Sequence, residues 1–241
     1  MNNFETFEKK TFIFDFDSTI FPGETLDEII SFALKDDPQR AIKSRKITKI
    51  CDLGMSGEIS MEESLRRRLK IASPTKQNIA DYVAIKKERI EGKFRGILKD
   101  LQAAGHRVLV VSGGFEEWII PLLDGIIPAE NIHANKIKDP EEPMTIDNII
   151  RKTKEEIIEA LKITDSEIIQ VGDGMTDFSV FEKGIAKEFF GAFFYENESR
   201  KKVQEKAIKS GQECFYSIDD FVEHMKSKYC GLIQIPAKFL T

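Results

Sequence analysis

The chain has 241 residues, of which 41% are hydrophobic and 32% are charged. At about 150 residues per domain, this length allows one large domain or one core domain with a smaller insert, and it excludes a short peptide or a long repeat array. The apolar content excludes disorder throughout the chain. The formal net charge of −5 is spread along the sequence, so we expect no nucleic acid as a partner.

No stretch approaches the roughly 18 uninterrupted apolar residues of a membrane span, so we expect no membrane partner either. The first ten residues mix acidic and basic side chains and do not resemble a secretory signal. Cys51, Cys214 and Cys230 are too few and too far apart for a disulfide framework. We therefore expect a cytoplasmic protein with reduced thiols.

Short apolar runs of β type alternate with amphipathic helical stretches along the chain. The predicted strands are Thr11–Phe16, Arg107–Val111, Glu167–Val171, Glu188–Tyr195 and Glu213–Ile218. Apolar residues on both sides of the pleat are typical of strands buried on both faces in a parallel sheet. We therefore predict an α/β fold with a doubly wound, mostly parallel sheet.

Helical periodicity fills the intervals between these strands. Apolar stripes at Leu26–Ala33, Ile97–Leu101 and Ile157–Leu161 predict core-facing helices, and Thr25 and Glu28 have the spacing of a capping box. The Pro-rich segment 139–143 predicts a turn or hairpin tip.

One long interval interrupts the alternation of strands and helices. Between residues 19 and 90 the sequence has helical patterning and no convincing strand, and a plain loop of that length would be unusual. We predict an all-α insert, a small cap, over residues 21–90. Residues 1–20 and 91–241 would then form the α/β core.

Two carboxylates, Asp15 and Asp17, end the first predicted strand on the same side of the chain. They lie at the carboxyl edge, where open α/β sheets bind ligands. Apolar neighbours make such a pair costly unless a cation or a proton compensates. The alternative interpretation is an ordinary turn and helix cap at Asp17 and Ser18.

A third predicted strand delivers Asp173 between two glycines, and Asp177 follows one helical turn later. Carboxylates that converge on one sheet edge indicate a hard divalent cation, and oxygen ligands with open positions suit Mg²⁺. We predict a metal site formed by Asp15, Asp17, Asp173 and Asp177. The alternative for Asp173 is ordinary turn chemistry.

The strand that ends at Val111 runs into Ser112 and Gly113 and then into a helical start. A hydroxyl, glycine amides and a helix N-terminus form a site fitted to phosphate, although Ser112 is alternatively a simple cap. Lys154 opens a helix at an end where lysine opposes the macrodipole, which indicates a functional reason. We expect it to neutralise phosphate and the carboxylates, with Lys152 as a competing candidate.

In this order the motifs resemble those of the haloacid dehalogenase superfamily of phosphatases. The four matching pieces are Asp15–Thr19, Ser112–Gly114, Lys154 and Gly172–Asp177. Within the superfamily the chain is most similar to the phosphoserine phosphatase family, from about residue 11 to 194. The resemblance implies a Rossmann-like core with a cap and a magnesium-dependent phosphomonoesterase.

The resemblance also implies a role for each matching residue. Asp15 would be the nucleophile that forms an aspartyl-phosphate, and Asp17 the general acid and base. Ser112, Gly113 and Lys154 would bind the phosphoryl oxygens. The expected partner is a small-molecule phosphomonoester, and we expect a monomer or a homodimer.

Four further positions match the substrate-selecting part of that family. Glu24 and Arg68 would contact the amino and carboxylate ends of phosphoserine, while Met55 and Met61 would help to close the pocket. The alternatives are a favourable acid at a helix N-terminus for Glu24 and a solvated helix face for Arg68.

Some positions depart from the family pattern. Met61 replaces an expected phenylalanine, and Pro22-Gly23 replaces polar residues in the loop after the first strand. Another small phosphomonoester, or transfer to a hydroxyl acceptor such as that of homoserine, therefore stays open. A receiver-like or non-catalytic phosphate-binding protein is the more distant alternative.

Overall fold

The computed structural model describes residues 8–56, 58–164, 166–195 and 200–231. Within them, a seven-stranded sheet has the order β4-β3-β2-β1-β5-β6-β7. The strands are β1 (Lys10–Phe14), β2 (Arg107–Phe115), β3 (Ile132–Ile137), β4 (Ile149–Ile150), β5 (Glu167–Gly172), β6 (Glu188–Ala192) and β7 (Glu213–Phe215). All neighbours pair in parallel except β3 and β4, which are antiparallel. The predicted doubly wound, mostly parallel sheet is therefore confirmed.

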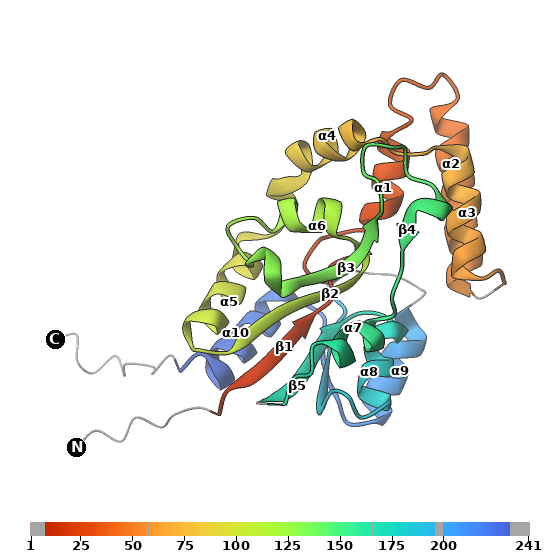
Figure 1. Ribbon diagram of the computed structural model, residues 1–241. Coiled ribbons are helices and arrows are strands. Elements are labelled where there is room, and N and C mark those ends of the chain that lie inside the picture. The colour runs from red at the N-terminus through yellow and green to blue at the C-terminus, as the bar shows by residue number, and fades with distance from the viewer. Residues whose placement is uncertain (1–7, 57, 165, 196–199, 232–241) are drawn as a thin grey trace, which may run out of the picture.

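Helices cover both faces of this sheet (Figure 1). They are α1 (Thr25–Phe32), α2 (Arg40–Ser56), α3 (Met61–Ile71), α4 (Lys76–Lys86), α5 (Gly92–Ala103), α6 (Glu116–Leu122), α7 (Lys154–Ala160), α8 (Met175–Glu182), α9 (Lys201–Lys209) and α10 (Ile218–Tyr229). Short 3-10 turns are η1 (Lys87–Arg89), η2 (Ala129–Asn131) and η3 (Ile146–Asn148). In the part of the chain that the structure describes, no helix is long and apolar enough to cross a bilayer.

The central strand shows why the sheet is covered on both sides. Phe12 and Phe14 of β1 pack into the large core cluster with α5 and α10, whereas Ile13 packs into a second cluster with α7. Each of these side chains is fully buried. Alternate residues of an extended strand point to opposite faces, so a continuous apolar run requires a helical layer on each side.

All five predicted strands exist, with altered ends. β2 continues beyond Val111 to Phe115, with a register shift against β3 in that part, while β6 already ends at Ala192. β3 and β4 were not predicted. The segment 139–143 lies between this antiparallel pair, as the predicted hairpin tip requires.

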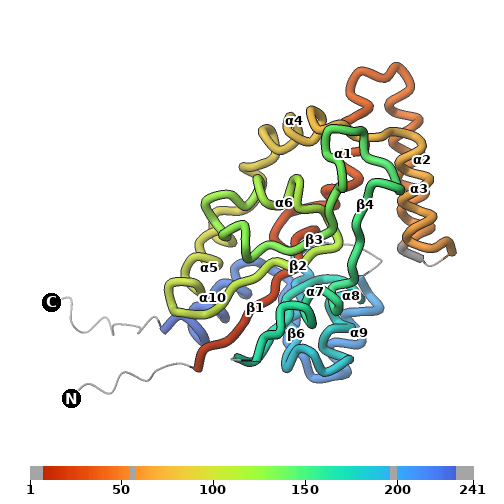
Figure 2. The backbone as a smooth tube through the Cα atoms, in the orientation of Figure 1, coloured from red at the N-terminus to blue at the C-terminus, as the bar shows by residue number. Residues whose placement is uncertain are grey.

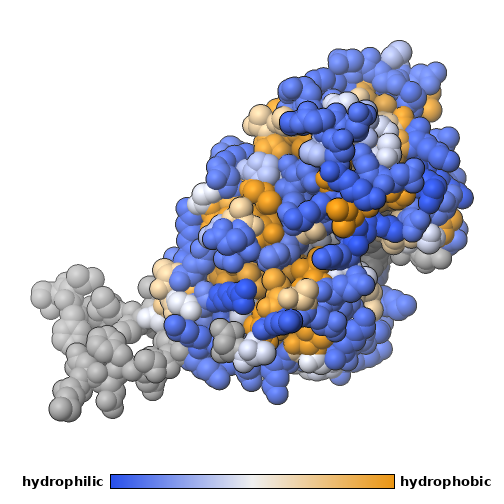
Figure 3. Space-filling model, in the orientation of Figure 1, coloured by the Kyte–Doolittle hydropathy of each residue, from blue (hydrophilic) through white to orange (hydrophobic). Residues whose placement is uncertain are grey.

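The interval between β1 and α5 is helical, as expected. Its described residues hold α1 to α4 and η1 and no strand, apart from an isolated bridge between Asp17 and Phe21. Figures 1 and 2 show these four helices beyond the carboxyl ends of β1 and β2. On the face shown in Figure 3, hydrophilic side chains dominate the surface, with smaller apolar patches between them.

The predicted capping box of α1 was wrong. Glu24 is the N-cap residue and makes no side-chain cap bond, and Thr25 is already the first helical residue. The hydroxyl of Thr25 instead accepts a hydrogen bond from Trp118 Nε1 at 2.8 Å, and the carboxylate of Glu28 binds Arg89. Tertiary partners therefore replaced the local cap.

Candidate active site

Three buried carboxylates meet at the carboxyl edge of the sheet. Asp15 follows β1, Asp173 follows β5, and Asp177 lies in the first turn of α8. One carboxylate oxygen of each lies within 4.8 Å of the others. β1 and β5 are paired neighbours in the sheet, which brings two acids to the same edge although they are far apart in sequence.

The close approach of Asp177 depends on a glycine. A Cβ at Gly172 would lie 2.3 Å from Cγ of Asp177, so no other residue fits between the end of β5 and this carboxylate. Asp177 also accepts hydrogen bonds from Gly174 N at 3.1 Å and from Gln170 Nε2 at 3.0 Å. The carboxylate is thereby fixed in orientation.

Two buried cations stand beside the carboxylates. Lys154 Nζ lies 2.8 Å from Asp15 Oδ1 and 2.5 Å from Asp177 Oδ1. Burial alone would lower the pKa of Lys154, but the charges of both aspartates outweigh it and raise the pKa above its ordinary value. Arg200 forms an ion pair with Asp173 through Nε and lies 3.0 Å from Glu24 Oε1 through Nη2.

The acidic groups are nevertheless undercompensated. Burial and the charges of neighbouring aspartates raise the pKa of Asp173 to about 8 against the opposing effect of Arg200. Burial and the charge of Asp15 raise the pKa of Asp177 to about 7 against Lys154. An all-oxygen donor set whose charged forms are this unfavourable fits a hard divalent cation, because a bound cation would relieve both the burial and the mutual repulsion.

Asp17 lies apart from this group and has a different environment. Its Oδ1 accepts a hydrogen bond from Thr25 N at 2.8 Å. Desolvation and the negative charge of Glu24 raise the pKa of Asp17 well above its ordinary range. A Cβ at Gly114 would lie 3.3 Å from Asp17 Oδ2, so the β2 end approaches this carboxyl closely. The arrangement is suited to a carboxyl group that carries a proton.

The phosphate-type motif lies next to these acids. Ser112 is buried in β2 and its Oγ accepts a hydrogen bond from Gly114 N at 3.0 Å, while Gly113 is exposed toward the pocket. Of the two candidate lysines, Lys154 reaches the carboxylates, whereas the side chain of Lys152 is exposed and its backbone N–H binds Asn135 Oδ1. The geometry therefore favours Lys154.

A pocket of about 390 Å³ opens onto these groups. It is lined by residues of the sheet edge and of α1 to α3, among them Asp15, Asp17, Glu24, Leu26, Asp27, Cys51, Met61, Ser112, Gly113, Lys154, Asp173 and Arg200. Met61 is half exposed at the pocket, at 51%. The side chain of Met55 lies outside what the structure describes.

Arg68 is buried and does not belong to a solvated helix face. Its Nη1 pairs with Asp27 and lies 3.9 Å from Cys51 Sγ, and its Nε donates to Ser64 O at 3.4 Å. The neighbouring Arg67 is exposed and pairs with Glu63 at 2.7 Å. The side chain of Glu24 likewise does more than interact with the helix dipole, since its Oε1 accepts a hydrogen bond from Ser18 Oγ at 2.8 Å.

Sequence reasoning missed Arg200 and Asp27. Arg200 stands in a basic stretch that resembles an ordinary solvated segment, and no local pattern marks it. Asp27 lies one turn along from the predicted substrate residue Glu24, so the acidic first turn of α1 was a usable signal. Both residues become evident only through the partners that the fold brings to them.

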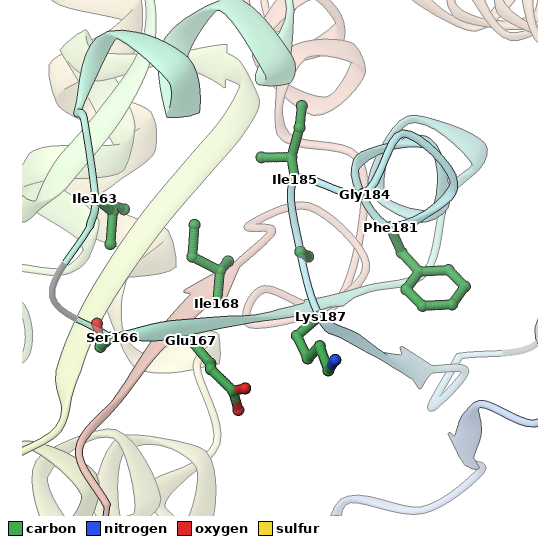
Figure 4. A pocket seen from close by; sticks show the side chains of 9 residues that line it. Ile163, Ser166, Glu167, Ile168, Phe181, Gly184, Ile185 and Lys187 are labelled. Carbon is green, nitrogen blue, oxygen red and sulfur yellow. The ribbon is translucent and has the colours of Figure 1, made fainter.

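A second hollow of about 460 Å³ lies at the opposite end of β5. Figure 4 shows Ile163 and Ile168 pointing into it, while Glu167 points to the other side of the strand. Its lining mixes apolar side chains with Ser166, Glu167 and Lys187, and no carboxylate cluster lies there among the described residues. The chemistry of the chain is therefore concentrated at the carboxyl edge.

Comparison with known proteins agrees with this geometry. The family model described as haloacid dehalogenase-like hydrolase matches residues 12–182. The phosphoserine phosphatase of Methanocaldococcus jannaschii is 30% identical over 193 residues, which cover 77% of this chain and 87% of that protein.

Two solved structures have the same fold. A phosphoserine phosphohydrolase-like protein from Francisella tularensis has a TM-score of 0.71 and 32% identity, over 89% of this chain and 99% of that one. A phospho-aspartyl intermediate analogue of phosphoserine phosphatase has a TM-score of 0.66 and 26% identity, over 90% and 99%. The chain thus belongs to the haloacid dehalogenase-like hydrolases and is a phosphoric monoester hydrolase similar to phosphoserine phosphatases.

Proposed function

We propose that the chain hydrolyses O-phosphoserine through a phosphorylated Asp15, with Mg²⁺ as its cofactor. The observation that carries this proposal is the group of buried carboxylates of Asp15, Asp173 and Asp177 beside Lys154. The relative from M. jannaschii is named for phosphoserine, and one similar structure is titled a phospho-aspartyl analogue, which supports both parts of the proposal.

In the first step a carboxylate oxygen of Asp15 attacks phosphorus, and the bond to the serine oxygen breaks. Asp17 donates a proton to that leaving oxygen, a role favoured by burial and by the charge of Glu24, which raise its pKa well above the ordinary range. In the second step Asp17 accepts a proton from the water that attacks the same phosphorus. Inorganic phosphate leaves and Asp15 is restored.

The remaining groups bind the phosphoryl oxygens and balance charge. Ser112 Oγ, Gly113 N–H and Lys154 Nζ line the pocket at the place where the phosphoryl group would bind. Asp15, Asp173, Asp177 and the carbonyl of Asp17 would hold Mg²⁺, which supplies positive charge that screens the phosphoryl group from the anionic nucleophile. Lys154, 2.8 Å from Asp15 Oδ1, orients this carboxylate before the substrate arrives.

Selectivity is assigned to the helical segment 21–90, which we propose acts as a cap over the pocket. Glu24 would bind the substrate ammonium. Nη2 of Arg68 makes no hydrogen bond within the described residues, and we assign it to the substrate carboxylate. Met61 would limit the size of the substrate at the pocket mouth. We propose the same role for Met55 from its place in the sequence alone.

Asp15→Asn tests the chemistry. Phosphate release from p-nitrophenyl phosphate should require Mg²⁺, stop in EDTA, and vanish in this variant. Asp17→Asn should accumulate a phosphorylated protein, detected by intact mass after an acid quench. Release that persists in EDTA or in Asp15→Asn would contradict the mechanism.

Arg68→Ala tests the substrate. Loss of a hydrogen bond to a charged group should raise KM for O-phosphoserine by about 10- to 100-fold and leave p-nitrophenyl phosphate unaffected. Arg67→Ala, on the exposed side of the same helix, is the matched control and should change neither. An unaltered KM for O-phosphoserine in Arg68→Ala would remove the carboxylate contact from the proposal.

A further inference from the structure

Arg89 joins the two stretches of chain that connect the core with α1 to α4. It ends η1 on the returning stretch, and its Nη1 donates to both oxygens of Glu28, at 2.7 and 2.6 Å. Its Nη2 donates to the carbonyl of Pro22 on the outgoing stretch. The guanidinium also lies 4.8 Å from the ring centre of Phe21. One side chain thus holds both connections.

A glycine makes this approach possible. Gly23 has φ +148°, and a Cβ on it would lie 2.6 Å from Glu28 Oε1 and 3.5 Å from Arg89 Nη2. The hydroxyl of Tyr82, in α4, also donates a hydrogen bond to Glu28 Oε2 at 3.1 Å. The residues Pro22-Gly23, which depart from the family pattern, therefore form part of a local packing arrangement.

Residues 22–24, which we call the clamped segment, lie next to the contacts of Arg89 with Pro22 and Glu28 and include a pocket residue. Glu24 lies between Pro22 and Glu28, the two points that Arg89 grips, and its carboxylate accepts hydrogen bonds from Ser18 and Arg200. Its neighbour Thr25 is held separately, because Thr25 Oγ1 binds Trp118 of the core. Movement of the segment at residues 22–24 would therefore displace Glu24 more than the Thr25 N–H that binds Asp17.

We propose that Arg89 is a positioning residue for recognition of the substrate ammonium: it fixes the 22–24 segment so that Glu24 faces the pocket, and it does not itself touch the substrate. This inference rests on the proposed function, in which Glu24 binds an ammonium group. A simple exposed ion pair would contribute little, but the planar guanidinium grips two separate stretches at once. A lysine presents one compact ammonium in place of two separate nitrogens on a planar fork, so it cannot reproduce the Nη1 contact with Glu28 and the Nη2 contact with Pro22 in the same geometry.

Arg89→Lys is the test, since it keeps the charge and the size of the side chain. kcat/KM for O-phosphoserine should fall about tenfold, mainly through a higher KM. This is the change expected when one charge-assisted hydrogen bond is lost. p-Nitrophenyl phosphate, which has no ammonium group, should be turned over as before. In a Glu24→Gln background the Arg89→Lys change should have no further effect on O-phosphoserine.

Arg95→Lys is the matched control. Arg95 donates to the carbonyls of Lys87 and Ile90, so it binds the returning stretch alone, and its replacement should leave the substrate preference unchanged. An equal loss with both substrates in Arg89→Lys, or no loss with O-phosphoserine, would overturn the positioning role.

Hydrogen exchange separates this inference from the proposed function. Ser18 N donates to Gly23 O at 3.1 Å, so the Ser18 amide reports on the clamped segment without any substrate. Its exchange should accelerate in Arg89→Lys and not in Arg95→Lys. Unchanged exchange in Arg89→Lys would show that Arg89 does not hold the clamped segment. If exchange accelerates but the wild-type protein does not hydrolyse O-phosphoserine, the proposed substrate and the ammonium role are wrong, while the structural role of Arg89 is retained.

Discussion

The buried carboxylates should make the metal-free protein less stable as the pH rises. The pKa of Asp177 is raised by burial from 3.8 to about 7, and that of Asp173 to about 8. The folded state therefore holds protons that the unfolded chain releases above pH 4. Stability from this source is complete below about pH 4, falls as the pH rises from there, and is fully lost above pH 7 to 8.

The size of the effect follows from the shift. About three pKa units at 1.36 kcal/mol each give roughly 4 kcal/mol for Asp177. Asp173 shares its neighbours, so we expect on the order of 4 kcal/mol for the two together rather than the sum. This is a large part of the ~5–15 kcal/mol that stabilises a typical domain.

Urea unfolding in EDTA between pH 6.5 and 8.5 measures the last part of this loss, about 2 kcal/mol, because the roughly 1.5 pH units that remain below the Asp173 pKa of about 8 count 1.36 kcal/mol each. His133 and His224, whose pKa values are lowered by burial, have an opposite effect that is confined to lower pH, so this interval isolates the carboxylates. Added Mg²⁺ should stabilise the protein, and by more at pH 8.5 than at pH 6.5, because it binds the deprotonated groups. Asp177→Asn should flatten the slope. A free energy of unfolding that stays level or rises with pH in EDTA would refute the reasoning.

Two further variants probe the support of Asp17. Trp118→Phe leaves the buried hydroxyl of Thr25 without its 2.8 Å donor, so it should lower the free energy of unfolding by about 1–3 kcal/mol, measured in urea. Gly114→Ala places a methyl group 2.9 Å from Ile119 Cδ1 and 3.3 Å from Asp17 Oδ2. Displacement of the acid should lower kcat at least tenfold with a smaller change in KM, and an unchanged kcat would show that Asp17 tolerates the shift.

The strands that could be predicted are those in which consecutive residues are apolar, which indicates burial on both faces of the sheet. The run through Phe12 and Phe14 is apolar on both sides, and such runs identified β1, β2 and β5. β3 escaped prediction because His133, Asn135 and Lys136 interrupt its pattern. Asn135 is nevertheless buried, because it binds Gly113 O and Lys152 N, contacts that only the folded sheet supplies.

The candidate site divides in the same way. Asp15 and Asp173 directly follow apolar strands, and Ser112 follows the apolar run within β2, so local sequence identified their place at the sheet edge. Arg200 and Arg89 have no such context. Each binds carboxylates or carbonyls on segments distant in sequence. The sequence around a single arginine in a charged stretch does not indicate these partners.

The position of β1 at the centre of the sheet also determines when the protein can assemble during synthesis. Lys10 is paired with Glu167, 157 residues later. At about 5–20 residues per second, the ribosome needs roughly 8 to 30 s to make that partner strand. During this time β1 has left the ribosome while its partner β5 has not yet been made. The apolar side chains of β1 are then exposed and available for chaperones to bind. The carboxylates of Asp15 and Asp173 meet only after most of the chain has been translated.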